Sequence, residues 1–216
     1  MHRTKSAVLS ALCFGLAAPA TAQTRNVNSP GVSVEIAPLA YILDTFSGQA
    51  GADVGGEVRF HGPLALFGDV NYMKENFKNG IDVFGAPQDQ SGQSLSLTAM
   101  ERTQAQGGLR LYLAPTNLYF QGSVVWQGGS YQYSQGTSTI TDDVQWVGPA
   151  VGVGARMTFV TNSYIRLGVD AVWPATWKQT ATDGGSGAAS AVSNVNGLWG
   201  TRGPIPNVTI AVGLPL

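Results

Sequence analysis

From residue 31 onward, apolar and polar residues alternate with a period of two, which predicts β-strands with one apolar and one polar face. The clearest segment is 118–126, in which Leu, Phe, Val and Trp share one face and Tyr, Gln and Ser share the other. Residues 164–173 repeat the pattern, with Arg166 and Asp170 opposite a wholly apolar face. Six further segments fit the same template: 32–43, 52–61, 64–73, 103–113, 144–159 and 207–216. The sequence therefore predicts eight strands.

The connections between these segments alternate in length. Short turns are expected at 61–63, 114–117 and 160–163, and longer loops at 44–51, 74–102, 132–143 and 178–204. This alternation is typical of bacterial outer-membrane barrels. Only a closed barrel or a helix satisfies every backbone hydrogen bond in lipid. We therefore predict an all-β fold, an eight-stranded antiparallel transmembrane β-barrel with short periplasmic turns and longer extracellular loops.

Residues 1–22 have the order of features that defines a secretory signal peptide. A positive start with Arg3 and Lys5 precedes a short apolar run, and Ala20-Thr21-Ala22 provides a small-x-small cleavage signal. The single cysteine, Cys13, lies in this segment. Residues 23–30 are mostly polar and are expected to form a flexible N-terminus, followed by one outer-membrane β-barrel domain at 31–216. The predicted location is the outer membrane of a Gram-negative cell.

Composition narrows the possible partners. Charged residues make up 12% of the chain, about half the usual share for a soluble protein. Without the signal peptide the chain carries 10 Lys and Arg (12 − 2) against 13 Asp and Glu, a net charge of −3. No basic patch indicates nucleic-acid binding. No later stretch reaches the roughly 18 continuous apolar residues of a transmembrane helix.

Aromatic residues mark both ends of the apolar faces. Phe60, Phe120 and Phe159 lie near the short turns, and a second set lies near the long loops: Tyr72, Trp126 and Trp173. Two such girdles are expected at the two interfaces of a membrane barrel. The alternative, aromatic core residues of a soluble sandwich, does not explain their position at both ends.

The polar faces carry charges of both signs, which are expected to form an ion-pair network in the lumen: Glu35, Asp53, Glu57, Arg59, Asp69, Arg110, Arg156, Arg166 and Asp170. Eight strands leave an interior about wide enough for side chains alone, which favours a closed plug. A narrow charged pore is the alternative.

Position along the strands suggests how these charges pair. Three of the arginines lie a few residues from a short turn and predict a basic layer at the periplasmic end, within reach of Glu35, Glu57 and Asp69. Arg166 and Asp170 are roughly 13 Å apart along one strand and should each pair with a neighbouring strand.

Candidate catalytic and metal-binding groups are few. His61, the one histidine after the signal peptide, lies beside a short turn, on the wrong side for a Ser–His pair acting on outer-leaflet lipid. Asp142-Asp143 lacks the alternating ligand spacing of a calcium loop. No catalytic residue, metal site or cofactor is expected.

The signal peptide ending Ala20-Thr21-Ala22, the eight alternating segments and the final strand together resemble small outer-membrane β-barrels of the OmpA transmembrane-domain and opacity-protein type. The resemblance covers residues 23–216 and rests on layout. It implies contact with outer-membrane lipid and lipopolysaccharide and with the barrel-assembly machinery. An extracellular partner is possible but is not identified by the sequence.

The function expected first is non-enzymatic: an integral outer-membrane barrel that provides surface contacts or envelope stability through its exposed loops. A narrow channel for small solutes is the alternative. A lipid A-modifying enzyme and a soluble, lipocalin-like binder are less favoured. Pro38 and Pro149 interrupt proposed strands and predict a bulge or a register break at each.

Overall fold

The computed structural model describes residues 30–36, 50–60, 62–81, 94–113, 116–135, 138–159, 163–183 and 204–216. The predicted signal peptide, nearly all of the predicted flexible segment, Pro38 and His61 lie outside these ranges. The strands are β1 (Gly31–Ile36), β2 (Ala50–Arg59), β3 (Leu64–Ile81), β4 (Ser96–Leu113), β5 (Leu118–Gln135), β6 (Ser138–Thr158), β7 (Tyr164–Val172), β8 (Thr176–Asp183) and β9 (Ile205–Pro215). Within the described ranges, no helix is long and apolar enough to cross a membrane.

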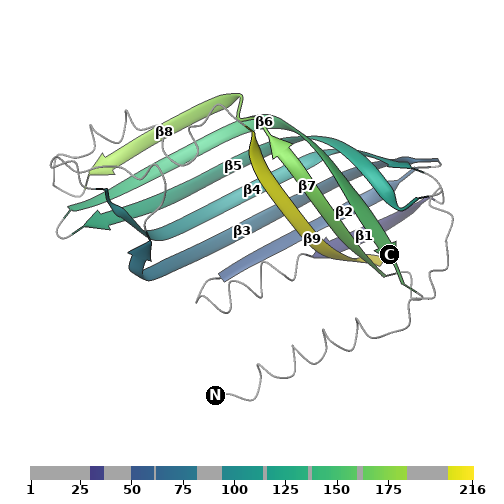
Figure 1. Ribbon diagram of the computed structural model, residues 1–216, viewed down its shortest axis with the longest axis horizontal. Coiled ribbons are helices and arrows are strands. Elements are labelled where there is room, and N and C mark those ends of the chain that lie inside the picture. The colour runs from purple at the N-terminus through teal and green to yellow at the C-terminus, as the bar shows by residue number, and fades with distance from the viewer. Residues whose placement is uncertain are drawn as a thin grey trace, which may run out of the picture.

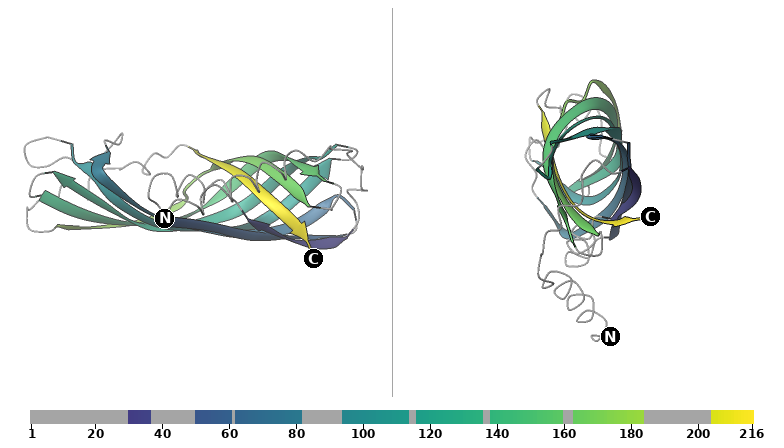
Figure 2. Two further views of the ribbon diagram at one scale, coloured as in Figure 1. Left: turned by 90° about the horizontal axis from the view of Figure 1, so that it is seen from below. Right: turned by 90° about the vertical axis from the view of Figure 1, so that its right-hand side faces the viewer.

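Eight of these strands close into a ring. Each pairs antiparallel with its neighbours in the order β5-β4-β3-β2-β1-β9-β7-β6, and β6 pairs with β5 to complete the circle. The first and last strands meet through pairs such as Val34 with Leu214. The oval outline in the right-hand view of Figure 2 shows this closure. The predicted fold class is therefore confirmed, and the ring itself has no unpaired edge.

Strand β8 continues β7 after a one-residue bulge. Both strands pair with β6, which advances three residues from Ala150 to Val147 while the other strand advances four, from Val172 to Thr176. The irregularity predicted at Pro149 thus lies on the neighbouring strand. Pairing of Pro149 with β5 is unbroken, and its carbonyl accepts a 2.9 Å hydrogen bond from the Trp173 amide.

Strands β3 to β6 are much longer than predicted. Three of them have 18 residues and β6 has 21, so the described parts of the loops expected at 74–102 and 132–143 are almost wholly strand, and β8 occupies part of the loop expected at 178–204. Figure 1 shows β3–β6 and β8 running on to the left, past the ends of β7 and β9. We call this part of the sheet the extension. The eight residues from Lys74 to the end of β3 span about 25 Å.

The outward face of the ring is an apolar belt, which begins at the short turns. On β5 it includes Phe120 and Val124, which are 52% and 57% exposed. Its last exposed large apolar residues toward the extension are Tyr72 on β3, Val124 on β5 and Trp173 after β7. Among the described residues of the extension, no large hydrophobic side chain is exposed.

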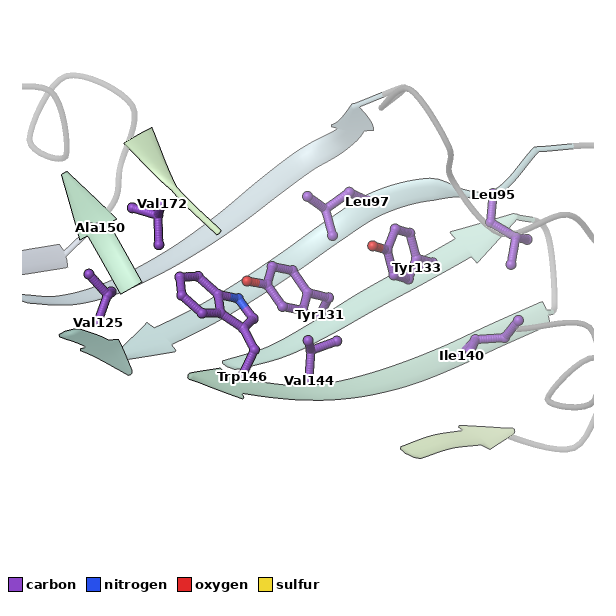
Figure 3. Close-up of a cluster of buried hydrophobic side chains, with 10 residues drawn as sticks. All are labelled: Leu95, Leu97, Val125, Tyr131, Tyr133, Ile140, Val144, Trp146, Ala150 and Val172. Atoms are coloured by element: carbon purple, nitrogen blue, oxygen red, sulfur yellow. The ribbon is translucent and has the colours of Figure 1, made fainter. Parts of the chain in front are cut away.

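The extension has its own hydrophobic core, on the face that continues the lumen wall. Figure 3 shows its side chains gathered on that face. Its buried members are Leu95, Leu97, Tyr131, Tyr133, Ile140, Val144 and Trp146, and the same cluster continues into the ring through Val125, Ala150 and Val172. Polarity therefore reverses along single strands: in the ring the apolar face points outward, and in the extension it points inward. The loop predictions were wrong because the outward apolar stripe, which identified the other strands, ends at the belt.

Candidate functional site

The lumen of the ring holds a buried charge network, formed by Arg59, Arg110, Arg156, Arg166, Glu35 and Glu57. Its first centre is Glu57, whose carboxylate contacts three arginines from three strands. Oε2 accepts from Arg110 Nη1 at 2.7 Å, and Oε1 accepts from Arg59 Nε and Arg156 Nη1, both at 2.9 Å. The Tyr112 hydroxyl also donates to Oε2, at 2.6 Å. One carboxylate thus joins β2, β4 and β6 across the lumen.

The second centre is Glu35 on β1. Arg166 donates to its Oε2 from both Nε and Nη2, at 2.9 and 2.7 Å, so two charge-assisted hydrogen bonds share one carboxylate oxygen. The Tyr164 hydroxyl donates to Oε1 at 2.8 Å, and Arg110 Nη1 lies 3.5 Å from the same oxygen. Because Arg110 contacts both Glu35 and Glu57, the two centres form one network.

Aromatic rings compensate for the surplus of positive charge in this network, which has four arginines and two glutamates. The guanidinium carbon of Arg59 lies 4.2 Å from the centre of the Tyr112 ring. That of Arg110 lies 3.9 Å from the Phe67 ring centre, and Arg156 lies 3.4 Å from that of Tyr164. A cation over an aromatic face is attracted by the ring quadrupole, and this attraction is stronger when both groups are desolvated.

Glycines on neighbouring strands make room for these long side chains. The Tyr119 hydroxyl lies over Gly154 and Gly168, where a β-carbon would overlap it, and it donates to the Leu167 carbonyl at 3.2 Å. In the same way the Tyr164 ring lies over Gly213. The interior of an eight-stranded barrel is narrow. Side chains therefore lie flat over adjacent strands, and those strands have glycine at the points of contact.

Asp170 lies near the network but outside its ion pairs. Its Oδ1 accepts a hydrogen bond from Gln121, whose own Oε1 accepts from Arg110 Nε at 3.1 Å. The bond from β7 to β5 passes over Gly152 on β6. The prediction that Asp170 and Arg166 pair with neighbouring strands is wrong, because each reaches one strand further. Arg166 bonds to Glu35 beyond β9, and glycine lets Asp170 pass over the strand between.

The remaining predicted acids are not part of the network. Asp53 and Asp69 lie on the lumen side of β2 and β3, half-buried, and form no ion pair with any residue in the described ranges. Asp69 was expected to reach the basic layer, but the arginines there are occupied by Glu35 and Glu57.

Sequence reasoning missed the uncharged members of the site. Tyr112, Tyr119, Tyr164, Gln121 and Ser33 are buried and bonded to the charged groups or to each other. The signal was present: Tyr112, Tyr164 and Ser33 have the same parity along their strands as an inward-facing charge, and Tyr119 and Gln121 lie opposite the apolar face of β5. Only carboxylates and arginines were selected from those faces, so the tyrosines, Gln121 and Ser33 were not included.

The six predicted interface aromatics take outward positions at the margins of the belt. Phe60, Tyr72, Phe120 and Trp173 are exposed, between 38% and 52%. Trp126 and Phe159 are partly exposed. In the described ranges, no group of three or more His, Cys, Asp or Glu side chains is arranged to hold a metal ion.

One acid of the extension has a perturbed titration. Asp142 on β6 lies beyond the belt, where it pairs with Tyr131 in the ladder. Burial raises the pKa of its carboxyl above the ordinary value of 3.8, although Gln179 Nε2 lies 3.0 and 2.9 Å from its two oxygens and opposes that effect. This carboxyl belongs to the core of the extension, so its charge affects the stability of that part.

Comparison with solved structures shows the fold. The crystal structure of CarO from Acinetobacter baumannii matches with 11% identity and a TM-score of 0.52, over 89% of this chain and 100% of that one. A major outer membrane protein from Thermus thermophilus matches with 13% identity and a TM-score of 0.50, over 87% of this chain and 100% of that one. No family model and no curated protein matches the sequence. The fold is thus that of an outer-membrane β-barrel, and the predicted outer-membrane location agrees with this fold and with the apolar belt.

Proposed function

We propose that this protein is a non-enzymatic outer-membrane barrel with a closed lumen, which anchors the extension and presents it outside the cell. Such a protein contributes surface contacts and envelope stability. The observation that carries the proposal is the burial of the charge network: the side chains of Arg110 and Glu57 have no exposed surface. A continuous water column through the ring would expose these groups.

The belt supports the anchoring role. On β5, outward residues are apolar from Leu118 to Trp126, a length of nine residues that suits the roughly 9–11 residues of a tilted membrane-spanning strand. A soluble barrel carries charged side chains on its outer face, so the lipocalin-like alternative does not explain this surface. The short turns and the C-terminus share one end, which is the periplasmic end in bacterial barrels.

The extension supports the presenting role. It stands above the belt as a sheet of long strands, and its own buried core gives it order without the support of lipid. A barrel that only conducts solutes has no need for about 25 Å of additional sheet on one side. The extension is the part of the described structure that is positioned to meet partners outside the cell.

Single-channel recording in planar lipid bilayers tests the closed lumen. The unmutated barrel is expected to give no stable conductance. A variant that carries both Arg110→Ala and Arg156→Ala loses two of the three cations around Glu57 and is expected to show openings. Lys74→Ala, which removes an exposed ion pair with Glu101, serves as the matched control and should remain silent. Stable, large conductance from the unmutated barrel would establish the channel function instead.

A further inference from the structure

The outward face of the extension is polar and continuous across several strands. Its centre is defined by Gln132 on β5, Thr141, Asp143 and Gln145 on β6, and Lys178 and Thr180 on β8. Ladder pairs join them side by side, with Thr141 next to Gln132, Asp143 next to Thr180, and Gln145 next to Lys178. All except Thr141, which is half-buried, are exposed. We call these six residues the outer polar face.

This face is the direct continuation of the lipid-facing surface. On β5 the outward side of the strand carries Phe120 and Val124 in the belt and then Gln132 in the extension. Since the strands run on without a turn, the molecules whose acyl chains cover the belt place their headgroups against the outer polar face. In the outer leaflet of a Gram-negative cell, those headgroups are the sugars of lipopolysaccharide.

The chemistry of the face selects the sugar portion of that lipid. Threonine hydroxyls and glutamine amides donate and accept hydrogen bonds, as sugar hydroxyls do. Lys178 and Asp143 are the charged residues among the six, and their charges cancel. Phosphate is commonly bound by Arg or Lys side chains, and protein hot spots are enriched in Trp, Tyr and Arg; the six residues include one lysine and none of the other three types.

We propose that the outer polar face binds the uncharged sugars of the lipopolysaccharide core, next to the barrel. This inference rests on the proposed function, because it requires the belt to lie in the membrane and the extension to stand outside the cell. The partner is the saccharide itself, and the acyl chains and phosphates of the same lipid are alternatives that the test separates.

The experiment measures the unfolding midpoint of the barrel in nanodiscs from the heat-dependent shift in gel mobility. Three lipids are compared: phospholipid alone, lipopolysaccharide with a complete core, and deep-rough lipopolysaccharide, which keeps the acyl chains and phosphates of lipid A but lacks most core sugars. Ligands that bind only the folded state raise the midpoint. We expect the complete core to raise the midpoint by several degrees over the deep-rough lipid.

A triple variant identifies the surface responsible. Thr141→Val, Gln145→Val and Thr180→Val remove the hydrogen-bonding groups and keep a residue that favours strands. In phospholipid and deep-rough discs it should melt with the unmutated protein, and in complete-core discs it should lose at least half of the increment. Equal midpoints in the two lipopolysaccharides, or an increment that the triple variant keeps in full, would overturn the proposal. A conducting barrel would instead contradict the closed lumen, so the two failures remain distinct.

Discussion

Arg110 on β4 reaches Glu57 on β2 by crossing the whole width of β3. The 2.7 Å contact joins residues 53 positions apart, and the guanidinium lies on the ring of Phe67, which β3 contributes between them. The β3 residue that pairs with Arg110 in the ladder is Ala65, whose side chain is small enough for Arg110 to pass over it. The ion pair therefore depends on three strands, and the intervening strand supplies both the space and an aromatic surface.

Replacing Arg110 with alanine is expected to destabilise the barrel by about 3–5 kcal/mol, the usual cost of removing one partner of a buried ion pair. Glu57 would keep Arg59 and Arg156, but Glu35 and Gln121 would lose contacts as well. Urea unfolding in lipid vesicles measures this change.

The exposed pair of Lys74 and Glu101 provides the comparison for that measurement. Both side chains are about half exposed, and water screens their 3.1 Å contact. Lys74→Ala should leave the free energy of unfolding unchanged within error. If the two variants lose equal stability, burial is not what makes the network important.

The stability cost of a charge at an outward position on β5 should depend on whether that position lies in the belt or in the extension. Val124→Arg places a cation in the apolar belt and should cost about 2–4 kcal/mol in a bilayer. Gln132→Arg has the same outward parity on the same strand, but it lies in the extension and should cost little. Equal costs in vesicles would show that the belt does not end where the outward residues become polar. Ser123 points into the lumen, where its hydroxyl accepts a hydrogen bond from Gln106. The cost of Ser123→Arg should therefore depend on the space available in the lumen and not on contact with lipid.

Glycines of the lumen wall should not tolerate a methyl group. Gly154→Ala forces Tyr119 away from the position where its hydroxyl bonds to Leu167, and overpacking of this kind costs about 1–3 kcal/mol. Gly122→Ala is the control, because nothing lies within 4 Å of the added carbon. Adding Tyr119→Ala should remove only the part of the Gly154→Ala penalty that Tyr119 causes, because the added carbon also overlaps the backbone carbonyl oxygen of Leu167; a double-mutant cycle measures that part.

The pH dependence of the extension should report Asp142. Its pKa is raised in the folded state, so its contribution to stability is fully present below the unfolded value of 3.8 and is lost as pH rises through the folded pKa. Above the folded pKa, the buried carboxylate lowers the stability of the extension. Asp142→Asn is therefore expected to flatten the dependence of the unfolding midpoint on pH above 3.8 and to raise the midpoint at pH 7. A lower midpoint at pH 7 would show that the hydrogen bonds to Gln179 require the charged form.

Alternation along the chain predicted the ring because lipid imposes one rule on every strand inside it. Leu118–Gln135 shows both the success and the limit: the first nine residues are apolar outward and were identified, and the rest are polar outward and were not, with a loop expected from Gln132 on. The period of two persists there, but the apolar face has moved inward to residues such as Tyr131 and Tyr133. A search for alternation alone, without a fixed apolar side, would have found the extension.

The candidate site was predictable to the extent that parity and charge define it. Glu57 and the arginines near the short turns were placed in the lumen from sequence, and the structure puts them in contact. Their specific partners were not predictable, because side chains that pass over a glycine skip a strand, as Asp170 does in reaching Gln121. Such contacts depend on where a glycine of the intervening strand lies between the two side chains. The register of the strands in the closed ring determines those positions.

The extra residue between β7 and β8 determines which side chains of β8 face inward. Before the bulge the even-numbered residues Tyr164 to Val172 face inward, and after it the odd-numbered ones do, so that Trp177 and Ala181 pack on the core of the extension. Removing one residue there would exchange the side chains of β8 that face inward with those that face outward. Lys178 and Thr180 would turn toward the apolar core, and the indole of Trp177 would turn toward the outer polar face. A single-residue deletion in this short connection is thus equivalent to exchanging the inner and outer surfaces of a whole strand.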